Sequence, residues 1–193
     1  MVFISLTPFL SRRMLAVLFA ILALSAISCF ADSNLFTVAA TPYDHQMARV
    51  KPVLTVAPAR ETETVSLDAV NRWMTDLRGI PYGYSMQWRT PTEVAHDPMA
   101  DCKGKAVALY ERMRAHGARN IRLVIGKRAP SSRVTHAWVE WTEDSQTYVL
   151  DPTFNRNACA AAEIPSKSYV PYYAFAGTRK FRAASVGDLY AKL

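Results

Sequence analysis

Cys102, His136 and Asp151 occur in sequence settings that suit nucleophilic catalysis. Cys102 follows Asp101, a residue type favoured just before a helix, and Gly117 is a typical helix stop. We therefore expect Cys102 in the first turn of a helix that runs to about residue 116. A thiol attacks as its thiolate, which a helix N-terminus and a nearby imidazolium both stabilise. Free N–H groups of that turn can also bind the oxyanion formed at an attacked carbonyl.

His136 and Asp151 lie on two segments that alternate as strands do, residues 134–141 and 147–151. A hairpin whose turn is centred after Glu143 places the two side chains directly opposite each other. Cross-strand neighbours on one face approach within about 4.5–5.5 Å at Cβ. The carboxylate can then orient the imidazole, as the third member of a catalytic triad does. The alternative is an ordinary polar pair on a sheet.

The cysteines leave a second possibility open. Cys102 and Cys159 remain once the N-terminal segment is removed, and two cysteines in an oxidising compartment can form a disulfide. In that case the chain is a catalytically inactive binding module. A fast-reacting thiol at Cys102 distinguishes the enzyme from this module.

Other candidate residues carry weaker signals. Gln87, or its neighbour Trp88, could add a side-chain donor to the oxyanion site. His45, His96 and His116 have no spacing typical of metal ligands, so we expect no metal site. No cofactor motif is present, and we expect no cofactor.

The N-terminus has the pattern of a secretory signal. Arg12 and Arg13 precede an uncharged apolar run over residues 14–27, and small residues follow up to Ala31. The run is short for a membrane-spanning helix, which needs about 20 apolar residues. We expect cleavage after Ala31, export to the periplasm and no stable membrane span. Lipid modification at Cys29 is the alternative.

Length and charge limit the remaining function classes. A chain of 193 residues suits one domain, and half of the residues are hydrophobic. The net charge of +7 includes two arginines and no acid in residues 1–31, which leaves +5 on the mature chain. The basic residues are scattered, so nucleic-acid binding has little support. We expect a monomer with an extended lead-in over residues 32–65 and a hydrolase domain over residues 66–193.

The pattern of elements predicts an α+β fold. Ser66 begins a helix that Gly79 ends, residues 80–99 form a long loop, and a second helix starts at Cys102. Strands follow at about 120–126, 134–141 and 147–151. Residues 169–182 are expected to add one or two strands or to wall the cleft, and residues 186–193 a short helix. This order favours helices packed on an antiparallel sheet.

Several stretches resemble the bacterial transglutaminase-like cysteine proteinases, relatives of the papain and transglutaminase fold. Within residues 66–155, the matching stretches are Val70-Asn71-Arg72-Trp73, Trp88-Arg89-Thr90-Pro91-Thr92-Glu93, Asp101-Cys102, Thr135-His136-Ala137-Trp138 and Val149-Leu150-Asp151-Pro152. The resemblance implies a Cys nucleophile on a helix packed against a sheet that carries the His and Asp. It also implies a protein substrate, such as a surface adhesin, cut in the periplasm.

One departure concerns calcium, which some relatives bind through acidic residues around the nucleophile. Relatives usually continue Asp-Cys with two acidic residues, whereas Lys103 and Gly104 stand here. Calcium prefers six to eight oxygen ligands, and a lysine removes one ligand and adds repulsion. We therefore do not expect a calcium site at Asp101. Lys103 is instead placed to favour the thiolate.

These features predict an exported cysteine hydrolase, with proteolysis as its leading activity. Cys102 attacks an amide carbonyl, His136 transfers the proton and Asp151 orients His136. If an amine replaces water as the acceptor, the same acyl-enzyme gives transglutamination or amide exchange. The sequence does not separate these two outcomes because both use one triad.

Overall fold

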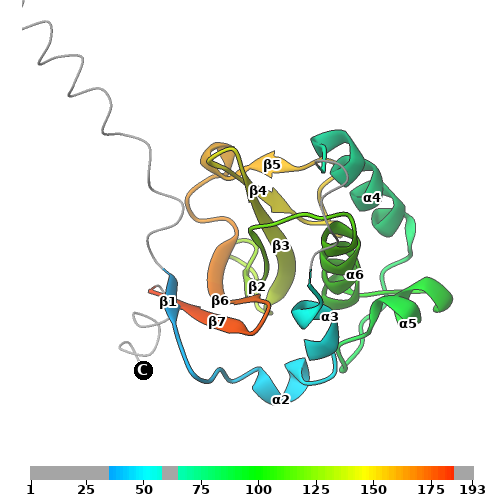
Figure 1. Cartoon of the computed structure of the whole chain (residues 1–193), viewed down its shortest axis with the longest axis horizontal. Coiled ribbons are helices and arrows are strands. Elements are labelled where there is room, and N and C mark those ends of the chain that lie inside the picture. Colours follow the sequence, from blue (N-terminus) through cyan, green and yellow to red (C-terminus); the bar gives the residue numbers. More distant parts are fainter. Residues whose placement is uncertain (1–34, 58–64, 185–193) are drawn as a thin grey trace, which may run out of the picture. The chain divides into compact units, whose positions relative to one another are not determined.

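The computed structural model describes residues 35–57 and 65–184 (Figure 1). The predicted signal sequence, with Cys29, and the predicted terminal helix over residues 186–193 lie outside the described residues. Within them, helices and strands are both present, as the sequence pattern predicts.

The described strands form one seven-stranded antiparallel sheet in the order β1-β7-β6-β2-β3-β4-β5. Their bounds are β1 Leu35–Thr37, β2 Ile121–Lys127, β3 His136–Glu143, β4 Gln146–Leu150, β5 Cys159–Ala160, β6 Val170–Ala176 and β7 Arg179–Ala183. The sheet confirms the α+β prediction, and β6 and β7 are the two strands expected from the aromatic tail.

The helices gather on one side of this sheet, with α6 beside β3 (Figure 1). Their bounds are α2 Asp44–Met47, α3 Lys51–Thr55, α4 Leu67–Gly79, α5 Pro91–His96 and α6 Cys102–Ala115. The 3-10 turn η1 Ala161–Glu163 lies apart from them, next to β4. Helix α6 packs against β2 and β3, while α3, α4 and α5 pack against α6. Helix α6 therefore lies between the sheet and these other helices.

Side-chain caps fix where the three longer helices begin. The Ser66 hydroxyl accepts a hydrogen bond from the Ala69 N–H, which confirms the predicted start of α4.

Helix α5 corrects the prediction of a continuous loop over residues 80–99. Thr90 and Glu93 form a reciprocal capping box, and Pro91 occupies the first turn. The Thr-Pro-x-Glu motif in the sequence is typical of a helix N-terminus and predicts this start.

The predicted extended lead-in is also wrong within its described part. Residues 35–57 contain β1 and the short helices α2 and α3. Met47, Val50 and Leu54 are buried in the same core as α4 and α6. This segment completes the domain core because its apolar side chains cover the helix layer.

The β3–β4 hairpin differs from the predicted pairing by two residues. Val139 pairs with Leu150, and the turn consists of Asp144 and Ser145, both at positive φ. The predicted pairing placed His136 directly opposite Asp151, so that register was wrong. A shift of two residues leaves each side chain on its original face of the sheet. His136 and Asp151 therefore still share a face, as diagonal neighbours.

Both faces of the sheet are covered. The main core lies between the sheet and the helices and includes Val139, Trp141 and Leu150. A smaller buried cluster consists of Val124, Trp138, Val149 and Ala174. This two-sided burial explains why β3 is buried along most of its length.

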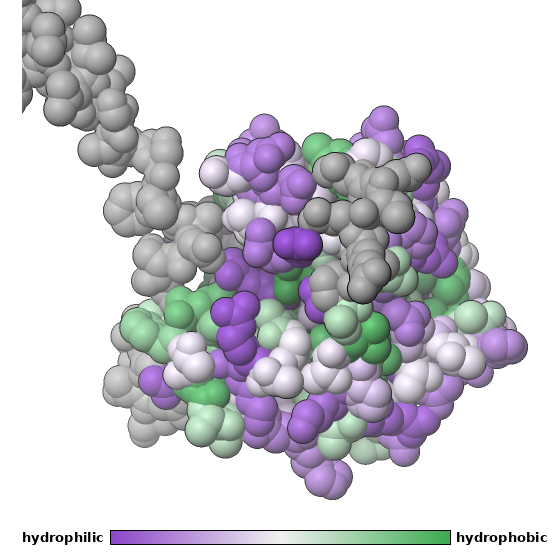
Figure 2. Space-filling model, in the orientation of Figure 1, coloured by the Kyte–Doolittle hydropathy of each residue, from purple (hydrophilic) through white to green (hydrophobic). Residues whose placement is uncertain are grey.

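The surface drawn in Figure 2 mixes polar and apolar residues, with the apolar ones in small groups. Exposed apolar side chains are common on folded proteins and need no special role. Among the described residues, none of the helices is both long and apolar enough to cross a membrane.

Candidate active site

Cys102 is the first residue of α6, and Asp101 caps the helix. Asp101 is fully buried, and its Oδ1 accepts a hydrogen bond of 3.0 Å from the Gly104 N–H. The Lys105 N–H bonds to the Asp101 carbonyl. Among the described residues, the N–H groups of Cys102 and Lys103 have no partner, as expected for the first turn of a helix. The thiol therefore lies beside free donors at a helix N-terminus.

His136 and Asp151 form a direct buried pair. The His136 Nε2 lies 2.8 Å from the Asp151 Oδ2, although the register places the two residues diagonally. A carboxylate accepts hydrogen bonds, so Nε2 carries the proton. The other ring nitrogen, Nδ1, is left for the Cys102 side chain, which also hydrogen-bonds to His136.

Electrostatics favour a charged His136. Burial alone lowers the pKa of the imidazole, but the hydrogen bonds to Asp151 and Cys102 outweigh it and raise the pKa to about 9. Two rings pack beside it: the centroid of Phe154 lies 5.3 Å and that of Trp138 6.2 Å from the His136 ring. The raised pKa favours the imidazolium form of His136 at neutral pH.

Asp151 is fully buried and satisfied on both oxygens. Its Oδ1 accepts from the backbone N–H groups of Thr153 at 2.9 Å and Phe154 at 3.3 Å. Burial alone raises the pKa of this carboxyl, but His136, Thr153 and Tyr169 together hold it below the ordinary value. The turn after β4 thus keeps a carboxylate ready to orient the imidazole.

Helix α4 holds the chain that follows Asp151. The Arg78 guanidinium donates 2.6 Å to the carbonyl of Phe154. The Asn71 Oδ1 accepts 2.7 Å from the N–H of Ala158. These two polar contacts give α4 a role in positioning the chain next to Asp151.

Tyr169 also belongs to this cluster, and its contact with Asp151 was not predicted from the sequence. Its hydroxyl donates 2.8 Å to the Asp151 Oδ2, and its ring packs edge-on against Trp138 at 5.4 Å. Its backbone has φ +52°, uncommon for a tyrosine, and its N–H bonds to the Arg128 carbonyl. In the sequence it was one of several aromatic residues expected to pack the sheet or wall the cleft. No sequence signal separated it from Tyr172 or Tyr173.

The structure gives Gln87 a different partner from the expected oxyanion. The Gln87 side chain is exposed, and its Oε1 accepts 2.6 Å from Arg49, which also pairs with Glu93. Trp88 is buried, and its indole N–H has no partner among the described residues. No contact places either side chain at Cys102.

Cys102 and Cys159 are both free thiols in this structure. Cys159 lies on β5, where it pairs with Val149 in the sheet. Burial raises the pKa of the Cys159 thiol, with Glu163 and Asp151 adding to the shift. A protonated thiol is a weak nucleophile, so Cys159 serves as an internal reference for thiol reactivity.

Solved structures with a fold similar to that of this chain are known. Its fold matches that of LapG from Legionella pneumophila. The EGTA-treated form aligns at a TM-score of 0.55 and 16% identity, covering 74% of this chain and 76% of LapG. The calcium-bound form gives a TM-score of 0.54 and 16% identity over 73% and 77%. No family model and no curated protein matches the sequence.

The solved LapG structures have a transglutaminase-like fold. At this identity, the likeness shows the shared fold. It supports the transglutaminase-like architecture expected from the sequence, with helices packed on an antiparallel sheet.

Because LapG is known in a calcium-bound form, we tested whether the residues here suit that ion. The Asp101 Oδ2 is in contact with the Lys103 ammonium, which already supplies a positive charge at the start of α6. No three His, Cys, Asp or Glu side chains of the described residues gather as a metal site. A cation beside an ammonium is repelled, so this donor set does not fit calcium.

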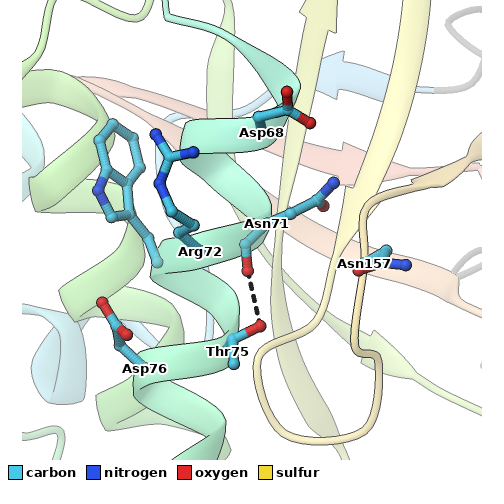
Figure 3. Close-up of a pocket in the computed structure, with 7 residues that line it drawn as sticks. Asp68, Asn71, Arg72, Thr75, Asp76 and Asn157 are labelled. Carbon is cyan, nitrogen blue, oxygen red and sulfur yellow. Dashed lines mark hydrogen bonds between the residues drawn. The ribbon is translucent and has the colours of Figure 1, made fainter.

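A pocket of about 570 Å³ is lined by α4 and by Asn157 from a neighbouring loop, and Cys102, His136 and Asp151 are not part of its lining (Figure 3). Its lining consists of Asp68, Asn71, Arg72, Trp73, Thr75, Asp76 and Asn157. The Thr75 hydroxyl donates to the Asn71 carbonyl within the helix. None of these lining residues is a cysteine, so this pocket is separate from the site at Cys102.

Proposed function

We propose that this protein is an exported cysteine hydrolase that cleaves amide bonds in protein substrates through Cys102, His136 and Asp151. The observation that carries the proposal is the contact chain from the Cys102 thiol through the His136 ring to the Asp151 Oδ2 at 2.8 Å. A buried nucleophile, a base and an orienting carboxylate in this order are the components of a catalytic triad.

The first half-reaction forms an acyl-enzyme. The Cys102 thiolate attacks the carbonyl carbon, and a carbon–sulfur bond forms as the carbonyl oxygen becomes an oxyanion. The unpartnered N–H groups of Cys102 and Lys103 are available to stabilise that oxygen. The His136 imidazolium donates its Nδ1 proton to the leaving nitrogen, the carbon–nitrogen bond breaks, and the amine departs.

The second half-reaction releases the acyl group. Neutral His136 now takes a proton from water, whose oxygen attacks the thioester carbonyl. The carbon–sulfur bond breaks, a carboxylic acid leaves, and the thiolate–imidazolium pair is restored. Asp151 keeps the Nε2 proton in place throughout, because its lone pairs at Oδ2 face that nitrogen.

The limited exposure of the nucleophile favours an extended chain as substrate. Cys102 is 8% and His136 is 7% exposed. Tyr82 lies near the thiol. Burial raises the pKa of Tyr82, and the charge of Cys102 raises it further. The basic and apolar N-terminus indicates export, so we place this activity in the periplasm.

The decisive experiment is labelling with a thiol-directed covalent inhibitor. Wild type and Cys159→Ser are expected to label rapidly at one site, which peptide mapping assigns to Cys102. His136→Ala is expected to label at least about tenfold more slowly, a loss of about 1.4 kcal/mol in activation. Equal labelling of wild type and His136→Ala, or a disulfide between Cys102 and Cys159 in the exported protein, contradicts the proposal.

A parallel assay separates hydrolysis from acyl transfer. Denatured protein substrates are incubated with and without a primary amine, and both new termini and ammonia are measured. New peptide termini without ammonia support proteolysis. Amine incorporation with ammonia release and no cleavage contradicts it and identifies an amide-exchange enzyme.

A further inference from the structure

The start of α6 contains a charged contact that the catalytic steps above do not use. Asp101 is fully buried, and its Oδ2 accepts 3.1 Å from the Ser85 N–H and contacts the Lys103 ammonium. An isolated buried carboxylate is strongly unfavourable unless it is paired and hydrogen-bonded. Lys103 is the cation that pairs with it.

The Lys103 ammonium is held on three sides. Besides the Asp101 Oδ2, it donates 2.8 Å to the carbonyl of Ser85 and lies 4.9 Å from the centre of the Tyr84 ring. An ammonium has three N–H donors, and these partners match that number. The side chain is 17% exposed, so the contact is largely screened from solvent.

This arrangement ties the loop before α5 to the nucleophile helix. Ser85 is bonded twice, through its N–H to Asp101 and through its carbonyl to Lys103. Asp101 itself caps the helix through Gly104. The Lys103 charge therefore holds the loop, the cap and the first turn of α6 together, directly beside Cys102.

We propose that Lys103 is a built-in cation that positions Asp101 and the Ser85 loop around Cys102, so that the site works without calcium. The inference rests on the proposed function of Cys102. A carboxylate oxygen and a backbone carbonyl are the ligand types that a calcium ion uses. Here both bind an ammonium that belongs to the chain, whereas LapG has been solved with calcium bound. Lys103 is a positioning residue because it acts through Asp101 and Ser85.

Calcium and chelator provide the first test on the whole mature protein. The rate of covalent labelling at Cys102 is measured in excess EGTA and in millimolar calcium. The expected rates agree within about twofold, and calorimetric titration with calcium gives no binding heat. Loss of labelling in EGTA that calcium restores overturns the inference. It leaves the proposed function intact, because labelling in calcium still depends on His136.

Charge variants provide the second test. Lys103→Met keeps the apolar stem and removes the ammonium, whereas Lys103→Arg keeps the charge. We expect labelling about tenfold slower in Lys103→Met and near the wild-type rate in Lys103→Arg. Lys167→Met is the matched control. Lys167 is exposed, and its replacement changes the net charge by the same amount. Equal labelling by Lys103→Met and Lys167→Met overturns the inference.

Lys103→Glu remains informative if Lys103→Met does not fold. This variant places two carboxylates together and removes the ammonium, so a cation is needed to relieve their repulsion. We expect its melting temperature and its labelling rate to rise on addition of calcium, with no such response in wild type. A Lys103→Glu protein that is stable and labels at the wild-type rate in EGTA contradicts the role of the built-in cation.

Discussion

The Tyr169 hydroxyl and the His136 Nε2 each lie 2.8 Å from the same oxygen of Asp151. One carboxylate oxygen thus accepts two hydrogen bonds, while the other accepts two backbone N–H groups. Burial and the charge of Asp151 raise the pKa of Tyr169, so the phenol stays protonated and donates. Tyr169 therefore fixes the carboxylate that fixes the imidazole.

Tyr169→Phe tests this positioning role. The substitution keeps the ring against Trp138 and removes the hydroxyl that contacts Asp151 and Asn155. We expect kcat to fall about tenfold with little change in KM, because the group acts through His136 and touches no substrate. Chemical denaturation should show a loss of about 1.5–3 kcal/mol, the range for a hydrogen bond to a charged group.

Tyr172→Phe is the matched control for this change. Tyr172 is a partly buried neighbour on β6 that packs against the main core. The same atom is removed without affecting Asp151. If both variants lose kcat to the same extent, Tyr169 acts through general packing around the start of β6 and not through the carboxylate.

Activity should fall on the alkaline side as His136 loses its proton. The raised pKa of about 9 means that the imidazolium needed to protonate the leaving nitrogen persists well above neutrality. Asp151→Asn removes a charge that raises this pKa, so the midpoint of the alkaline limb should move to lower pH. The check is kcat/KM across pH 5–11 for both proteins. An unchanged midpoint in Asp151→Asn shows that a different group controls the limb.

The free energy of unfolding should depend on pH through the His136–Asp151 pair, and the direction of each pKa shift sets the sign of the change. The folded pKa of His136 lies above 6.5, so its contribution is complete below pH 6.5 and is lost as pH rises towards about 9. The pKa of Asp151 is lowered, so its contribution is complete above the ordinary value of 3.8 and is lost below it. Unfolding free energy should therefore decline from pH 6.5 to 9 in wild type. The decline should be weaker in His136→Ala, and equal slopes contradict the assignment.

The sequence predicted that His136 and Asp151 meet, but it did not predict the register that brings them together. The alternation of apolar and polar residues predicted that His136 and Asp151 share one face of the sheet. This prediction is correct although the predicted register was wrong by two residues, because every second residue of a strand lies on the same face. The turn at Asp144 and Ser145 set the true register. Both residues adopt positive φ although neither is a glycine, so this turn lacks a strong sequence signal.

Contacts between distant segments could not be predicted in this way. Tyr169 reaches Asp151, and Asn71 reaches Ala158, only after the sheet and α4 have packed. Lys103 was recognised as a departure at the nucleophile, but its bond to Ser85 depends on the fold of the preceding loop. Helix α5 was a different kind of error, since its capping box was present in the sequence and was not used.

We expect that only glycine fits at position 126, next to His136. It pairs with His136 across β2 and β3, at the point where the β2–β6 register shifts. A Cβ at this position would lie 2.2 Å from the Val170 carbonyl oxygen and 2.7 Å from the Trp138 ring. The first contact is with backbone, so the sheet itself must move. We expect Gly126→Ala to lose about 3 kcal/mol or more of unfolding free energy, at or beyond the usual range for overpacking.

Gly79→Ala is the matched control for that substitution. Gly79 ends α4, and a Cβ there meets no atom within 4 Å. Alanine should therefore be neutral or stabilising by about 0.4–1 kcal/mol, through the reduced entropy of the unfolded chain. Urea denaturation of both variants measures the difference, and Cys102 labelling of folded Gly126→Ala reports on the triad. If Gly126→Ala is as stable as Gly79→Ala, then β6 does not pack closely against β2 behind His136.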